Sequence, residues 1–366
     1  MKIAFALVAH YPTDDRVYFQ LAETLKQAGH KVFIISTLTD NCDLPDIQCF
    51  DSKGWSKKLL IDKLQDCFSN CNPSIIICDN PIAILAAGKY KKLHKEIRIV
   101  YDVTEWYPSK KNLKELPFFK KIMKIILLSC LSVYAGCLTD AFVFGEHYKA
   151  KPFRFLFSWK KYIYLSYYAS IDQINIYPQK NIHEKCNLFY SGPLTIEKGF
   201  DKVLDVSNHT AKNHPETKFI LTIITGTNDY PISTDLPENL LIQRKGLLPF
   251  SDFCKEIGKY DLFFDLRTND VENTRSLPIK LFYYMACGRP MIYANLKAIR
   301  QGVPEMEQMG YLVNPMDLNE ICECISNYLS DDELYKSHCE TARKSALEKY
   351  NWDIIKDGFI QLISEL

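Results

Sequence analysis

The sequence predicts an α/β protein made of two Rossmann-like, doubly wound domains that face each other across a cleft. A chain of 366 residues is too long for one ordinary hydrophobic core. Apolar strand candidates alternate with amphipathic helix candidates in two successive series, which is the pattern of parallel sheets covered by helices on both faces. The polar stretch Tyr162–Lys185 separates the two series and is predicted to hold the interdomain linker. We therefore expect domains at 1–170 and 171–350, and a last helix over 351–366 that crosses back to the first domain.

The first series opens with the apolar strand Lys2–Ala9 and the polar turn His10–Arg16. Its other expected elements are the helix Val17–Ala28, the strand Lys31–Ser36, the helix Ser56–Asn70, the strand Ser74–Cys78, the helix Ile82–His94, the strand Ile97–Tyr101, a long helix and the strand Asp140–Phe144. In such a sheet, ligands bind at the carboxyl ends of the strands.

The second series opens with the strand Cys186–Tyr190. Its other expected elements are the helix Gly199–Lys212, the strands Lys218–Thr225 and Leu240–Gln243, the helix Phe250–Gly258, the strand Asp261–Asp265, and three helices near Asp317–Leu329, Asp331–Lys349 and Trp352–Leu366.

One stretch of the second series combines a loop, a short helix, a tight turn and a strand. Pro278 suits a first helical turn, whereas Gly288 and Pro290 end the helix. Arg275 and Lys280 lie close to the start of this helix, where backbone N–H groups face outward. The stretch is therefore suited to receive an anion such as a phosphate.

Composition narrows the class of protein. The formal net charge is +1, which gives no basic excess for nucleic-acid binding. The 13 cysteines are scattered without the spacing of a metal site, and the closest pair, Cys322 and Cys324, is too close for a zinc knuckle. We therefore expect no metal, free thiols, no cleaved leader and a cytoplasmic location.

Five segments, in this order, match motifs of one known enzyme family. They are His10–Arg16, Tyr101–Glu105, Ser191–Gly199, Leu277–Gly288 and Tyr350–Trp352. Through them the chain resembles the two-domain (GT-B) retaining glycosyltransferases of family 4, over nearly its whole length. The resemblance implies transfer of a sugar from a nucleoside-diphosphate sugar, UDP- or GDP-linked, to a glycan or lipid-linked acceptor. It also implies no cofactor and no metal, since the sequence has no Asp-x-Asp motif.

A departing diphosphate needs positive charge and N–H donors around it. Lys198 matches the family's diphosphate lysine, although a lysine at a helix start can also be simply solvated. Lys280 either serves the same anion or is merely exposed. Gly192 and Gly199 permit a close approach of the backbone to phosphate.

The sequence departs from the family motifs at several positions of this site. Arg275 and Tyr283 occupy the positions of a glutamate pair, Pro193 replaces an arginine, and Glu272 is the nearest substitute carboxylate. The resemblance assigns the donor site to Gly192, Glu197, Lys198, Gly199, Gly226, Arg244, Glu272, Arg275, Ser276, Leu277, Pro278, Lys280 and Tyr283. Arg275 either supplies the missing positive charge or pairs with Asp270 or Glu272 on the surface.

The loop after the first strand carries the residues that we expect to bind the acceptor, namely His10, Asp14, Asp15 and Arg16. Arg16 either contacts the ligand or pairs with Asp14 or Asp15.

The expected catalytic residues are Lys198, Asp102, Thr104 and Glu105. Thr104 occupies the position of the family's histidine. Asp102 and Glu105 lie at the carboxyl end of a strand, where a carboxylate either orients the acceptor hydroxyl or, for Glu105, satisfies a helix start.

The departures leave two hypotheses open. The chain is either an active glycosyltransferase of glycan assembly or a catalytically silent GT-B protein that binds or scaffolds beside an active partner. Nucleotide binding distinguishes the two.

A basic and aromatic segment suggests contact with an anionic membrane surface at the inner membrane face. Its lysines are Lys110, Lys111, Lys114, Lys120, Lys121 and Lys124. The apolar run Ile125–Leu138 that follows is, at about 14 residues, too short to span a bilayer. The alternative is a buried helix of the first domain.

Overall fold

The computed structural model describes the chain except for residues 9, 40–43, 106–107, 109–112, 114–115, 180, 227–229 and 233–234. It divides the chain into two compact units. One unit comprises Met1–Tyr167 with Ile355–Leu366, and the other comprises Tyr168–Ile354.

Seven parallel strands form the sheet of the first unit within the described residues, in the order β3-β2-β1-β4-β5-β6-β7. The strands are β1 (Lys2–Leu7), β2 (Lys31–Ser36), β3 (Ile47–Cys49), β4 (Ile75–Cys78), β5 (Arg98–Val103), β6 (Ala141–Phe144) and β7 (Lys161–Tyr164). β4 and β6 are buried along their whole length, which explains why both read as unbroken apolar runs.

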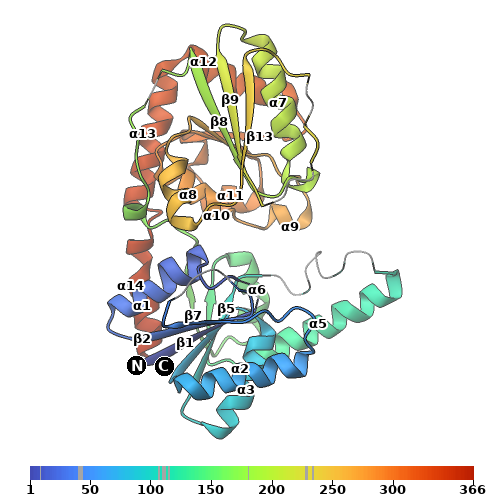
Figure 1. The fold of residues 1–366 in the computed structure, drawn as a ribbon, viewed down its shortest axis with the longest axis vertical. Coiled ribbons are helices and arrows are strands. Elements are labelled where there is room, and N and C mark those ends of the chain that lie inside the picture. Colours follow the sequence, from blue (N-terminus) through green and yellow to red (C-terminus); the bar gives the residue numbers. More distant parts are fainter. Residues whose placement is uncertain are drawn as a thin grey trace. The chain divides into compact units, whose positions relative to one another are not determined.

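The helices of this unit cover the sheet. They are η1 (Asp15–Ala22), α1 (Glu23–Gln27), α2 (Lys57–Cys71), α3 (Pro81–Leu93), α5 (Phe118–Leu138), α6 (His147–Leu156) and α14 (Trp352–Ser364). α2, α3 and α5 pack side by side (Figure 1). Side chains cap α2 and α3 at Ser56 and Asn80, and Pro81 occupies the first turn of α3.

Two expectations for this unit need correction. The helix expected over 17–28 begins as the π-helix η1 at Asp15 and becomes α-helical only at Glu23. The segment expected to be the interdomain linker begins with the strand β7, which pairs with β6 at the edge of the sheet. A four-residue edge strand with two exposed residues has too weak an apolar pattern to be recognised from sequence.

The second unit repeats the architecture with a six-stranded parallel sheet in its described residues, in the order β10-β9-β8-β11-β12-β13. Its strands are β8 (Lys185–Ser191), β9 (Lys218–Ile224), β10 (Leu240–Lys245), β11 (Leu262–Asp265), β12 (Met291–Ala294) and β13 (Gly310–Val313). Its helices are η2 (Ile171–Gln173), η3 (Ile196–Lys198), α7 (Phe200–Asn213), α8 (Phe250–Ile257), α9 (Val271–Thr274), α10 (Ile279–Ala286), α11 (Lys297–Gly302), η4 (Met306–Gln308), α12 (Leu318–Ser330) and α13 (Asp332–Glu348).

The last helix, α14, returns to the first unit, as the sequence predicted. Its start is tied to the second unit, because the Trp352 N–H donates to the Ala169 carbonyl oxygen at 3.0 Å. Residues from Ile355 onward group with the first unit. There Arg98 donates to the carbonyl oxygen of Leu366 at 3.0 Å, and Lys161 pairs with Glu365 at 3.0 Å. Two parallel α/β sheets with a returning C-terminal helix confirm the predicted fold class.

A glycine makes the close pairing of β12 and β13 possible. Gly310 pairs with Met291, and a Cβ atom added at Gly310 would lie 2.0 Å from the Met291 carbonyl oxygen. Because that neighbour is backbone in a buried strand, it cannot move aside as a flexible side chain would.

We therefore expect Gly310→Ala to reduce the free energy of unfolding by about 3 kcal/mol. Urea denaturation measures this loss, with Gly246→Ala as the control, since an added Cβ at Gly246 meets no atom within 4 Å. A loss below about 1 kcal/mol for Gly310→Ala would show that the two strands separate easily.

Candidate functional site

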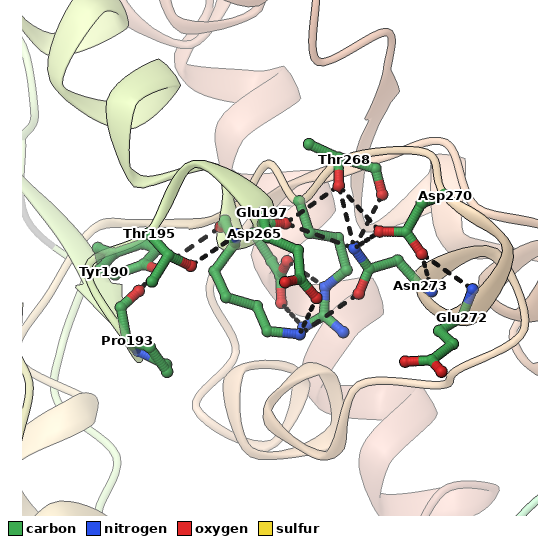
Figure 2. A network of polar contacts seen from close by, with 11 residues as sticks. Tyr190, Pro193, Thr195, Glu197, Asp265, Thr268, Asp270, Glu272 and Asn273 are labelled. Atoms are coloured by element: carbon green, nitrogen blue, oxygen red, sulfur yellow. Dashed lines mark hydrogen bonds and ion pairs between the residues drawn. The ribbon is translucent and has the colours of Figure 1, made fainter. Parts of the chain in front are cut away.

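Two loops at the carboxyl edge of the second sheet are joined by hydrogen bonds to Asn273 (Figure 2). One loop follows β8 and the other follows β11. The Asn273 amide nitrogen donates within its own loop to the Thr268 carbonyl oxygen at 3.0 Å, and across to the Glu197 carbonyl oxygen of the β8 loop at 3.4 Å. The Thr268 N–H donates to the Glu197 carbonyl oxygen at 3.1 Å. Asn273 is buried, so these bonds fix the β8 loop against the β11 loop.

Lys198 belongs to this network. Its Nζ donates to Asn273 Oδ1 at 3.3 Å and lies 3.8 Å from the Glu197 carboxylate. Burial lowers the pKa of Lys198, and the neighbouring Arg267 charge lowers it further. A partly buried cation beside a second cation is a suitable place for a phosphate.

Gly199 allows the loop of Lys198 to lie this close to β11. Its φ is +72°, and an added Cβ atom would lie 2.0 Å from the Leu266 carbonyl oxygen. Both facts require glycine here.

Arg267 is a basic residue of the site that sequence reasoning missed. Its guanidinium donates two hydrogen bonds to the carboxylate of Asp265, at the end of β11. The bond from Nε to Oδ1 is 2.6 Å long. Burial alone would lower the pKa of Arg267, but the Asp265 carboxylate outweighs burial and raises it. Arg267 is therefore a fixed positive charge beside Lys198.

Lys280 reaches the same loop from the first turn of α10. Its Nζ donates to the Ser191 carbonyl oxygen, and an added Cβ at Gly192 would lie 3.1 Å from that Nζ. The structure thus brings the two predicted cations, Lys198 and Lys280, to opposite ends of one glycine-bounded loop.

The two residues at the family's glutamate positions lie in different surroundings. Tyr283 is buried, and its ring packs against Phe250 and Phe253 at 5.5 and 6.2 Å between centroids. Arg275 is exposed. Its expected surface partner Asp270 caps α9 by accepting from two backbone N–H groups.

The other predicted donor residues lie nearby in the sequence or line a hollow. Ser276 and Leu277 are half-buried and Pro278 is buried, immediately before α10. Gly226 and Arg244 line a hollow of about 540 Å³ together with Thr225, Lys245, Gly246 and Leu247. This hollow lies at the carboxyl ends of β9 and β10, on the same edge of the sheet as the Lys198 loop.

Arg16, in the first unit, makes a buried ion pair that corrects the sequence expectation. Its Nε and one terminal nitrogen donate to the two oxygens of Asp102 at 3.0 Å each, and the other donates to the Leu165 carbonyl oxygen at 3.0 Å. The partner is therefore Asp102, 86 residues away, rather than Asp14 or Asp15. Burial alone would lower the pKa of Arg16, but the Asp102 carboxylate raises it.

The carboxylates of Asp14 and Asp15 serve the start of η1. Asp14 Oδ1 accepts from the Arg16 and Val17 N–H groups at 3.1 and 3.2 Å, and Asp15 Oδ1 accepts from the Arg16 N–H at 2.9 Å. Burial, together with the charge of Asp15, raises the pKa of Asp14 to about 6. Asp14 is consequently a carboxyl that can exchange a proton near neutral pH.

His10 pairs with Asp79, a residue that sequence reasoning missed. The ring Nδ1 lies 2.8 Å from Asp79 Oδ2, and Asp79 also accepts from the Val8 N–H at 2.9 Å. Burial alone would lower the pKa of His10, but the hydrogen bond and charge of Asp79 raise it to about 9. The imidazole is therefore positively charged at neutral pH.

Thr104 lies beside a second buried ion pair. Its carbonyl oxygen accepts from Lys149, whose Nζ also lies 3.1 Å from Glu146 Oε1 and 3.3 Å from the Tyr167 hydroxyl. Burial would lower the pKa of Lys149, but Tyr167 and Glu146 raise it. The neighbouring Glu105 is half-buried. Among the described residues, the structure contains no group of three or more His, Cys, Asp or Glu side chains arranged to hold a metal.

Searches with the sequence found no matching family model and no matching curated protein. The structure, however, matches solved structures over essentially its whole length. HepE from Anabaena, in a complex with UDP and glucose, superposes with a TM-score of 0.74 at 14% identity, covering 100% of both chains.

The chain has the GT-B fold.

Two other solved structures agree. Sucrose-phosphate synthase from Thermosynechococcus elongatus has a TM-score of 0.70 at 14% identity, covering 99% of this chain and 98% of its own. WaaG, a glycosyltransferase involved in lipopolysaccharide biosynthesis, has a TM-score of 0.70 at 12% identity, covering 97% and 98%. At such identities the likeness establishes the fold of glycosyltransferases. The roles of the individual residues stay predictions.

The residues missed from sequence differ in the signal that they left. Asp79 directly follows the buried strand β4 and precedes the Asn80 cap of α3, so its position at the carboxyl edge was readable. Asn273 left no signal, because an asparagine in a polar loop is typical of any turn.

The pKa of His10 tests the electrostatics of this edge. Replacing Asp79 by Asn removes the largest raising contributions and leaves burial opposed only by the weaker charges of Asp14 and Asp102, so we expect the pKa to fall from about 9 toward 6.5. NMR titration of the imidazole measures it, with Asp15→Asn as the control. In the wild type the pair contributes stability below pH 6.5, and this contribution is lost as the pH rises through about 9. A wild-type pKa near 6.5 would contradict the assignment.

Proposed function

We propose that this chain transfers a sugar from a UDP- or GDP-linked donor to a glycan or lipid-linked acceptor, with retention of configuration and without a metal. We further propose that it works at the cytoplasmic face of a membrane. The observation that carries the proposal is the pair of lysines, Lys198 and Lys280, at the two ends of the glycine-bounded loop after β8.

The chemistry of the leaving group supports this assignment. A nucleoside diphosphate departs with negative charge, which must be stabilised as the glycosidic bond to the donor breaks. Lys198 lies beside the fixed charge of Arg267 and next to a loop whose glycines admit close backbone approach. Arg267 is hydrogen-bonded to Asp265, so we propose that it acts on the diphosphate through its electrostatic field and not through a direct contact. Lysines in this arrangement can take the place of a divalent cation.

Structures that share the fold support a nucleotide-sugar donor. Those of HepE hold UDP, UDP-glucose, or UDP with glucose, and another neighbour, from E. coli, is bound with UDP-2-fluoro glucose. UDP is accordingly the first nucleotide to test, and GDP is the second.

The first unit offers groups suited to an acceptor. Asp79 raises the pKa of His10 to about 9, and burial raises the pKa of Asp14 to about 6. A cation beside an exchangeable carboxyl suits an acceptor that carries an anionic group and a hydroxyl. Both oxygens of Asp102 accept hydrogen bonds from Arg16, so we propose that Asp102 stabilises this edge of the sheet. Glu105 is then the better candidate to contact the acceptor.

A second candidate function is a catalytically silent GT-B protein that binds or scaffolds. Tyr283 favours it, because a ring packed against Phe250 and Phe253 occupies the position of the second glutamate of the family pair. Exposed Arg275, at the other glutamate position, cannot accept hydrogen bonds from sugar hydroxyls.

If the chain is active, Lys198→Ala should reduce turnover by about 10²–10³, as expected for the loss of one electrostatic donor. Release of nucleoside diphosphate from a panel of UDP- and GDP-sugars measures turnover. Lys202→Ala is the matched control, because this lysine lies in α7 and pairs with Asp201. Turnover in Lys198→Ala equal to that of the wild type would remove Lys198 from the mechanism.

Arg275 provides a separate test of the rearranged charges. We expect Arg275→Glu to weaken the binding of UDP or GDP, although it restores the family residue, because a planar guanidinium suits phosphate oxygens. Isothermal titration calorimetry measures the dissociation constant, with Arg300→Glu as a control on α11. Unchanged or tighter binding would leave Arg275 as a surface residue.

A further inference from the structure

The helix α5 exposes a continuous apolar stripe. Phe119, Met123, Ile126 and Val133 are 80%, 71%, 58% and 40% exposed, and the exposed Cys130 and Cys137 extend the same line. These residues recur every three or four positions, so they lie on one face of the helix. From Phe119 to Cys137 the stripe is about 27 Å long, at a rise of about 1.5 Å per residue. Exposed apolar surface of this extent needs a partner.

The helix is long and apolar enough to cross a bilayer, which corrects the sequence estimate based on Ile125–Leu138 alone. Its packing argues against crossing. Ser132, Ala135 and Gly136 are buried, and an added Cβ at Gly136 would lie 2.3 Å from the Phe157 ring. The chain then enters β6 of the sheet, so the end of α5 is fixed to the folded unit.

Basic side chains accompany the stripe. Lys120 and Lys121 are exposed, Lys124 is half-buried, and all three lie in the first two turns. At about 100° per residue, Lys120 lies at the edge of the stripe, whereas Lys121 and Lys124 lie toward the opposite side of the helix. The other predicted lysines, Lys110, Lys111 and Lys114, lie outside the described residues. A helix with an apolar face and flanking lysines is suited to lie in the plane of an anionic membrane surface.

A basic hollow of about 750 Å³ adjoins the other end of α5. Its basic side chains are Lys91, Lys92, Lys95, Arg98, Lys160 and Lys161. Asp140 and Glu365 oppose them there and pair with Lys91 and Lys161 at 2.6 and 3.0 Å, and a Leu366 oxygen accepts from Arg98 at 3.0 Å. Lys92 and Lys95 are exposed at its rim. The hollow therefore keeps a net positive charge.

The hollow and the stripe are connected. Lys160 donates to the Gly136 and Cys137 carbonyl oxygens, in the last turn of α5, at 2.7 and 2.9 Å. The adjacent Trp159 is 74% exposed and lines the hollow. Tryptophan is enriched where proteins meet the boundary between headgroups and acyl chains.

We propose that the stripe of α5 and the basic hollow at its end form one docking surface for an anionic phospholipid bilayer. The helix lies in the membrane plane, its stripe enters the acyl boundary, and a lipid phosphate lies over the hollow. Charge complementarity selects the bilayer as the occupant, because Lys120 at the edge of the stripe and the basic side chains of the hollow require an anionic partner. The inference does not depend on transferase activity, and its test needs no sugar donor.

Sedimentation with phosphatidylcholine vesicles, with and without about one third phosphatidylglycerol, tests the apolar part of the proposal. The wild-type protein should bind the anionic vesicles at low salt and dissociate as salt rises well above about 0.1 M. Met123→Glu should weaken binding about tenfold or more. Met316→Glu is the matched control, a methionine of equal exposure (73% against 71%) in the other unit, and should leave binding unchanged.

The charge is tested in the same assay. Changing Lys120, Lys121 and Lys124 together to Gln should weaken binding about fivefold for each lysine. The control changes three exposed lysines of the second unit, Lys212, Lys336 and Lys344, and should have little effect. Because the proposal places a lipid phosphate over the hollow, the double change Lys92→Gln and Lys95→Gln should also weaken vesicle binding.

Four results would overturn the proposal. The first is a wild-type protein that ignores both kinds of vesicle at low salt. The second is binding that survives Met123→Glu or the triple lysine change. The third is tight binding of soluble glycerol phosphate, which would make the hollow a site for a small phosphate. The fourth is a wild-type protein that does not bind vesicles but forms a dimer that Met123→Glu dissociates. The stripe would then bind a second copy of the chain and not a bilayer.

Discussion

The parallel pairing of the strands is the constraint on which the candidate site depends. Since every described strand pair in both sheets is parallel, the loops that follow the strands gather at one edge of each sheet. In the second unit this edge joins the loop of Lys198 to the loop of Asn273, and in the first unit it joins His10 to Asp79 and Arg16 to Asp102. Residues far apart in the sequence thus become neighbours without any local signal.

Most buried charged side chains at these edges form an ion pair with another side chain of the same unit. Arg16 with Asp102, Lys149 with Glu146 and Arg267 with Asp265 are three largely buried pairs. Each pair would cost several kcal/mol if one partner were removed, since the other charge would remain buried. Lys198 differs from these cations, because it is about one-third exposed and its pKa is lowered rather than raised. Lys198 is therefore available to a ligand, whereas the three paired cations stabilise the fold.

The sequence predicted the two α/β units, most strand positions and the returning last helix, because buried parallel strands leave unbroken apolar runs. It also located the loops of His10 and Lys198, since these follow such strands directly. It could not show that Arg16 selects Asp102, because that choice depends on the order of β1, β4 and β5 in the sheet. The sequence left open whether α5 is buried or in contact with a membrane surface, since an apolar helix has the same residue pattern in both cases.

The central claim is that the second unit binds a nucleoside diphosphate at the glycine-bounded loop after β8, which has Lys198 at one end and Lys280 at the other. Denaturation of the wild-type protein with and without UDP or GDP tests it most directly. A ligand at 100 times its dissociation constant should raise the free energy of unfolding by about 2.7 kcal/mol. The account predicts this stabilisation for at least one of the two nucleotides. No stabilisation by either nucleotide, at concentrations that saturate a millimolar site, would contradict it.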